Sequence, residues 1–147
     1  MIGLEFRETM AGSYHLASAP AEELPMSFTI RARSRGLGGF LRRPVTEIEG
    51  EVDAEGLADH RYLRGSLELD VLRTGTLVYD FRFTANDGRR CAFEGKKTLR
   101  PSDLLESMTV LPGRIVAEGG EEIGEALLRF DLRSDLLRFL RSFRLVR

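Results

Sequence analysis

Two ionisable residues in strand-like segments are the first candidates for chemistry. Glu8 lies between Phe6 and Met10, and Lys96 follows Gly95 in another alternating segment. If both side chains point into a core they form a buried ion pair, which is costly unless each charge is paired and hydrogen-bonded. Such a pair can orient the polar end of a bound ligand. In the alternative, both side chains lie on the solvent face and have no specific role.

An aromatic stripe is the second candidate. Alternation over 76–84 places four side chains on one face, namely Leu77, Tyr79, Phe81 and Phe83. Phe93 joins them across a hairpin, because Asn86–Gly88 has the composition of a tight turn. One interpretation is the wall of an apolar ligand cavity, with the Tyr79 hydroxyl as polar anchor. The other is a plain hydrophobic core.

The remaining reactive side chains carry no recognisable motif. His15 and His60 are the only histidines, and Cys91 shows no metal-ligand spacing to either of them. No serine has the glycine pattern of a nucleophile elbow. We therefore predict no catalytic residues, no metal ion and no cofactor.

Two arginine-rich stretches could form an anion-binding or membrane-surface face. Residues 31–43 carry five arginines and no acid, and residues 129–147 carry six arginines against Asp131 and Asp135. Both stretches include a Phe-Leu pair in an amphipathic helical pattern, at 40–41 and 139–140. The alternative is a solvated helix surface in an arginine-biased sequence.

Strands dominate the elements that must position these residues. We expect eight to ten strands, the clearest over 3–10, 27–33, 46–52, 62–72, 76–84, 90–99, 108–117 and 123–133. We also expect short helices over 37–42, 101–106 and 136–146.

A recurring segment indicates how the strands are arranged. Residues 12–43 and 113–143 share a glycine, an apolar pair, an acidic turn (Glu22-Glu23 and Glu121-Glu122), an alternating strand and a Phe-Leu-Arg helix. Residues 50–69 repeat the strand–turn–strand part of this segment and lack the helix. Repeated hairpins predict a meandering antiparallel sheet, which tends to close because closure removes exposed edges. The expected fold is all-β: one domain over 1–147, an antiparallel meander closed or nearly closed into a lipocalin-like barrel, with short helices including a C-terminal one.

Composition limits the function classes. The net charge of −1 argues against nucleic acid as the main partner. A single cysteine excludes an internal disulfide and fits a reducing compartment. The sequence shows neither a leader-like start nor an apolar run long enough to span a membrane, so we expect a cytoplasmic protein.

Several short motifs together resemble a known type of module: Phe6-x-Glu8-x-Met10-x-Gly12, Tyr79-x-Phe81-x-Phe83, Asp87-Gly88 and Phe93-x-Gly95-Lys96. The chain resembles a bacterial β-rich accessory module found beside sterol-oxidase-type (glucose-methanol-choline) oxidoreductases and α/β-hydrolases. The resemblance implies a lipid- or sterol-related context without a catalytic role, and it marks Glu8 and Lys96 as motif positions. The chain lacks a flavin-binding glycine motif and any tryptophan.

The preferred functional hypothesis is non-catalytic binding of a small apolar or amphipathic molecule. Tyr79, Phe81, Phe83 and Phe93 would line the cavity, and Glu8 with Lys96 would meet the polar head. The alternative is an interaction module with a filled core that docks on a partner enzyme. A third hypothesis is a barrel cyclase or isomerase that uses Glu8 or His15 as base. Incomplete closure would favour a homodimer.

Overall fold

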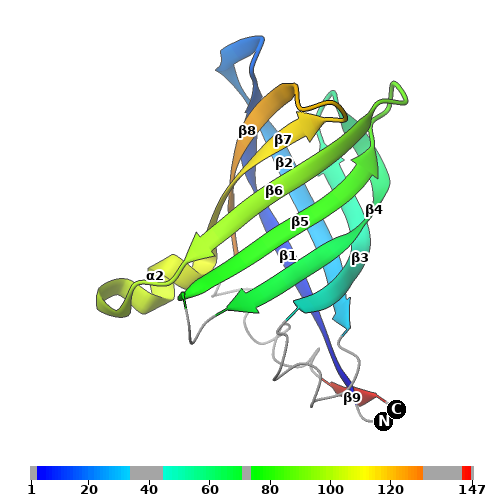
Figure 1. Cartoon of the computed structure of the whole chain (residues 1–147). Helices are drawn as coiled ribbons and strands as arrows, with labels where there is room; N and C mark the ends of the chain where they lie inside the picture. The colour runs from blue at the N-terminus through cyan, green and yellow to red at the C-terminus, as the bar shows by residue number, and fades with distance from the viewer. Residues whose placement is uncertain (1–2, 34–44, 71–73, 131–143, 147) are drawn as a thin grey trace.

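The computed structural model describes residues 3–33, 45–70, 74–130 and 144–146, most of which lie in long antiparallel strands (Figure 1). The strands are β1 (Gly3–Leu16), β2 (Ala19–Arg33), β3 (Val45–Ala54), β4 (Ala58–Asp70), β5 (Thr76–Thr84), β6 (Arg90–Thr98), β7 (Val110–Ala117), β8 (Glu122–Arg129) and β9 (Arg144–Val146). A 3₁₀ turn, η1 (Pro101–Asp103), leads into the short helix α2 (Leu104–Thr109).

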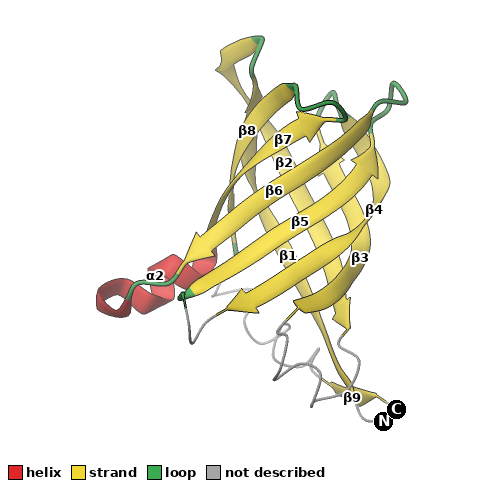
Figure 2. Cartoon of the chain, viewed as in Figure 1, coloured by secondary structure: helices red, strands yellow, loops and turns green. Residues whose placement is uncertain are grey.

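The sheet closes into a barrel because β1 pairs on both sides. Strands β2 to β8 follow one another in sequence order, and β1 pairs with β8 and with β2. On one side Ala11 is paired with Arg129, and on the other Met10 is paired with Phe28. Figure 2 shows the wall of strands with α2 beside one end. The predicted all-β fold, an antiparallel meander closed into a barrel, is confirmed.

Alternation of side chains separates the interior from the surface. Along β5, Tyr79, Phe81 and Phe83 are buried while Arg82 and Thr84 are exposed. The bounds of this strand, 76–84, match the sequence-based expectation. The strand is easily recognised because apolar and polar residues alternate from Tyr79 to Thr84.

Glycines allow the sheet to curve tightly. A Cβ atom added at Gly50 would lie 1.9 Å from the Thr29 carbonyl oxygen, and one added at Gly65 would lie 2.0 Å from the Asp80 carbonyl oxygen. Neighbouring strands thus approach so closely that only glycine fits at these two positions. Glycine within a strand is typical of such bends in barrels.

The first hairpin differs from the repeat-based prediction. β1 extends to Leu16, and its turn lies at Ala17 and Ser18. Glu22 and Glu23, expected in an acidic turn, lie instead within β2. The expectation was wrong because polar and proline residues weaken the alternation at the start of β2, although β2 pairs with β1 on both sides of them, at Ala19 and at Leu24.

The C-terminal prediction also needs correction. The expected helix over 136–146 reaches Arg144–Val146, but these residues form strand β9, which pairs with Gly3–Glu5 at the start of β1. Extended backbone is favoured there because β1 offers unpaired hydrogen-bonding groups beyond the end of β8. The rest of that helix and the helix expected over 37–42 lie outside the described residues.

The helical turn expected after β6 is present as η1 and α2, over 101–109. Among the described residues, no helix is long and apolar enough to cross a membrane.

Candidate functional site

A polar cluster lies inside the barrel among apolar side chains. Strand alternation turns Glu8 of β1 inward between Phe6 and Met10, and Tyr79 of β5 inward beside Phe81. The Tyr79 hydroxyl donates a hydrogen bond of 2.6 Å to Glu8 Oε1. The cluster therefore joins two strands that are not neighbours in the sheet, across the interior of the barrel.

Lys97 of β6 completes the cluster. Its Nζ atom lies 3.5 Å from Glu8 Oε2 and 5.1 Å from the centroid of the Tyr79 ring. The side chains of Lys97 and Glu8 are only 3% and 9% exposed. One carboxylate oxygen of Glu8 therefore accepts a hydrogen bond from Tyr79, and the other forms the ion pair with Lys97. The Lys97 ammonium also lies within cation–π distance of the Tyr79 ring.

The expected pairing of Glu8 with Lys96 is corrected by this geometry. Lys96 is exposed on the outer face of β6, and Lys97 is the buried partner. The reason is the two-residue period of a strand: Phe93 and Gly95 point inward, so the next inward position is 97. The alternation already signalled Lys97, whereas the short motif indicated its neighbour.

The pKa of Tyr79 is raised well above its usual value of 10.0. Burial is the largest cause, and the nearby Glu8 carboxylate adds to it through its charge and through the hydrogen bond. The phenol is thus held in its protonated form, in which it can donate to Glu8.

The predicted aromatic stripe packs mainly against itself and against Phe28 of β2. The rings of Phe81 and Phe93 stack with centroids 5.0 Å apart, and Phe28 meets them at 5.2 and 5.7 Å. Phe83 follows at 6.2 Å from Phe81, and Tyr79 lies 6.0 Å from Phe28. These centroid distances are those of favourable aromatic pairs.

Phe93 also fills the space that two inward-facing glycines leave. A Cβ atom at Gly113 would lie 2.5 Å from Phe93 Cζ, and one at Gly95 would lie 2.8 Å from Phe93 Cε1. The ring thus lies directly over the backbone of β6 and β7. In the described middle of the barrel, the side chains that were predicted to line a cavity pack against one another instead.

The remaining reactive side chains do not converge on the cluster. His15 Nε2 lies 3.8 Å from Glu125, and His60 Nδ1 lies 3.2 Å from Asp53, both at partly or largely exposed sites. Cys91 is a buried free thiol whose pKa burial raises. Across the described ranges, no group of three or more histidine, cysteine or acidic side chains could hold a metal ion.

A second buried acid, Glu5, was missed by the sequence analysis. It is 2% exposed, and its carboxylate lies 3.4 Å from Arg33 Nη2 and 4.0 Å from Arg31 Nη1. The feature that could have identified Glu5 is the opposite charge of Arg33, with which it is paired in register. Because Glu5 and Glu8 differ in strand parity, Glu5 belongs to the outer face and not to the cluster.

The outer wall carries a groove of about 820 Å³ near the turns that join β5 to β6 and β7 to β8. Its polar rim consists of Arg61, Tyr62, Arg82, Arg90, Glu94 and Glu118. Its floor includes the partly exposed side chains of Ala92 and Val116. This arrangement combines arginines, an exposed aromatic ring and apolar surface, as protein-binding sites often do.

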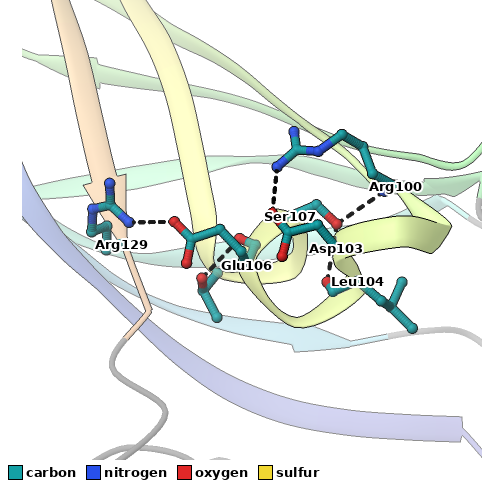
Figure 3. Close-up of polar contacts among 7 residues, drawn as sticks. Arg100, Asp103, Leu104, Glu106, Ser107 and Arg129 are labelled. Carbon is teal, nitrogen blue, oxygen red and sulfur yellow. Dashed lines mark hydrogen bonds and ion pairs between the residues drawn. The ribbon is translucent and has the colours of Figure 1, made fainter.

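Polar contacts hold α2 beside the other end of the barrel (Figure 3). Arg129 Nη1 lies 2.9 Å from Glu106 Oε1, and Arg100 Nη2 lies 3.3 Å from Asp103 Oδ2. The backbone N–H of Arg100 donates to Ser107 Oγ at 3.0 Å, and that hydroxyl donates to the Leu104 carbonyl. These cations thus already have anionic partners, unlike some of those near the groove.

The side chains of the cluster could bind a polar group, but they already bond to one another. Glu8 already accepts from Tyr79 and faces Lys97, so action as a general base would require one of these contacts to break. Comparison of the chain with models of known protein families, with curated proteins and with solved structures found no match.

Proposed function

We propose that this barrel is a non-catalytic interaction module that acts through its outer surface on a partner protein. The observation that carries the proposal is the packing of the interior. Phe28, Phe81 and Phe93 occupy the middle of the barrel with ring centroids 5.0 to 5.7 Å apart. A ligand at that depth would have to displace them, at a cost in packing contacts.

The polar cluster supports the same proposal. A receptor site needs hydrogen-bonding capacity that is free before the ligand arrives. Here Glu8, Tyr79 and Lys97 satisfy one another, and the described buried side chains include no polar atom without a hydrogen-bond partner. The cluster therefore fits a structural role that fixes β1 against β5 and β6.

The resemblance to accessory modules beside oxidoreductases and hydrolases implies a similar role. In that setting the partner is an enzyme, and the barrel contributes a surface. Such a partner would be held by the rim and floor of the groove over β4 to β7.

A second candidate function is the binding of a small amphipathic, lipid- or sterol-like molecule in a lipocalin-like interior. One observation favours it: an ion pair 3.5 Å long buried in an apolar barrel. Ion pairs in such surroundings are costly, and some serve to orient a ligand's head group. In this case the head would meet Lys97 and Glu8 where β5 begins and β6 ends, and the aromatic rings would move aside.

Native mass spectrometry with organic extraction separates the two functions. For the interaction module we expect the mass of the bare chain and no uptake of a fluorescent fatty-acid probe. A reproducible co-purifying lipid, lost in the folded variant Tyr79→Ala, would overturn this proposal in favour of ligand binding. Circular dichroism of each variant confirms that the barrel is intact.

A further inference from the structure

Two neighbouring arginines on the outer wall lack an anionic partner. Arg64 of β4 and Arg82 of β5 lie directly opposite each other in register, and both are exposed. Among the described residues neither forms an ion pair, although most other arginines there do. Like charges directly opposite each other destabilise a sheet. An anion bound between the two arginines would relieve this repulsion.

The carboxylate directly opposite Arg64 is already engaged elsewhere. Glu49, opposite Arg64 on its other side, lies 3.3 Å from Arg31 Nη2 and accepts a hydrogen bond of 3.2 Å from Tyr62. Arg82 has the uncharged Ala92 as its other cross-strand neighbour. Asp80 lies two residues before Arg82 on the same face of β5, so one carboxylate faces two guanidinium groups and a net positive charge remains.

The adjoining groove has the same sign of charge. Arg61 Nε bonds to the neutral side chain of Asn86 at 3.1 Å. Arg114 engages Glu94 through two nitrogen atoms at 3.0 and 3.1 Å. Arg90 lies 4.0 Å from Glu118, so these two opposite charges largely offset each other. Arg61 and Arg82, with Arg64 just beyond the rim, remain as the net cationic surface.

We propose that this arginine groove binds a short acidic segment of a partner protein. This inference rests on the proposed function, because it names the surface and partner chemistry of the interaction module. Carboxylates of the segment would pair with Arg82, Arg64 and Arg61, since a guanidinium matches a carboxylate in two-point geometry. An apolar side chain of the segment would lie against the floor, next to the 60% exposed ring of Tyr62.

The acidic outer face of β3 favours a short segment over a long polyanion. Glu47, Glu49, Glu51 and Asp53 follow one another on that face, which adjoins β4. A nucleic acid that extended past the groove would meet these carboxylates. The net charge of −1 for the whole chain points the same way.

Fluorescence anisotropy with a labelled octaglutamate peptide tests the inference on the full chain. We expect saturable binding at about 50 mM salt that weakens strongly by about 500 mM. The variant Arg64→Gln/Arg82→Gln should weaken binding about tenfold, which corresponds to two exposed charge contacts. The control variant Arg100→Gln/Arg129→Gln removes the same charge near α2 (Figure 3) and should leave the affinity unchanged.

Each result decides the inference. If both variants lost the same affinity for the peptide, the effect would be due to net charge alone and the proposed site would be overturned. Tighter binding of single-stranded DNA than of the peptide would also overturn it. Absence of any peptide binding at low salt would also overturn the acidic partner. That outcome would not refute the proposed interaction module, because a separate measurement tests that proposal. Uptake of lipid into the interior is the result that would refute it.

Discussion

The buried ion pair allows a quantitative test of what the polar cluster contributes to stability. We consider the single variants Glu8→Gln and Lys97→Met and the double variant that combines them. Gln keeps an oxygen that can accept from Tyr79, and Met keeps much of the length of the lysine chain. Each single variant leaves one buried charge without its partner, whereas the double variant leaves none.

The expected magnitudes follow from distance and burial. For a separation of 3.5 Å, Coulomb's law with an effective dielectric constant of about 20 gives about 5 kcal/mol of attraction. Removing one member of a buried pair costs about 3–5 kcal/mol, because the remaining charge stays desolvated. Replacing both members by groups of similar volume is often close to neutral. We therefore expect a coupling free energy of at least about 2 kcal/mol between the two positions.

Urea unfolding followed by circular dichroism, with linear extrapolation to water, measures the four free energies of unfolding. A matched control cycle uses the exposed pair of Glu94 and Arg114, whose nitrogen and oxygen atoms lie 3.0 Å apart. Glu94→Gln and Arg114→Met should couple by less than about 1 kcal/mol, because water screens them. If the Glu8 and Lys97 effects were additive within about 0.5 kcal/mol, the buried pair would not act as a unit and our reasoning would fail.

Three further predictions test the packing and the titration of the interior. Gly113→Ala should destabilise the barrel by about 1–3 kcal/mol in urea unfolding, because its Cβ atom would overlap Phe93; Phe93→Leu should relieve much of this loss, and an additive double variant would contradict the overlap. Because the pKa values of Tyr79 and Tyr14 are raised, the unfolded chain ionises first, so stability should fall as the pH rises above about 10; Tyr79→Phe should reduce that fall, and an unchanged pH profile would count against it. The Cys91 thiol is buried and its pKa is raised, so it should react with a disulfide reagent far more slowly in the native than in the urea-unfolded protein; equal rates would contradict this.

The barrel could be predicted from the sequence because alternation and hairpin turns are local signals. Apolar and polar residues alternate from Tyr79 to Thr84, and the turn at Asn86–Gly88 fixes the partner strand. β1 was predicted too short because Gly12 interrupts the apolar alternation, although it pairs with Met26 and Leu128. Such pairing is a property of the neighbouring strands, which a local pattern cannot contain.

The candidate site was predictable only in part. The sequence left open whether Glu8 points inward, and the choice of Lys96 as its partner followed a motif and not the strand period. What the sequence could not reveal is that Glu8 meets Tyr79 and Lys97 across the interior. That distance depends on how far the strands tilt when the sheet closes, which no single segment specifies.

The closure of the sheet along β1 has a consequence for how the chain folds. Seven of the eight barrel pairings join strands that follow each other in sequence, and each can form as a local hairpin. The eighth joins β1 to β8, so residues near 11 can complete their pairing only after the chain has brought residues near 129 beside them. Until then β1 and β8 remain open edges, able to pair with other chains. This one long-range seam should set the folding rate, and substitutions along it should slow folding more than those within any hairpin.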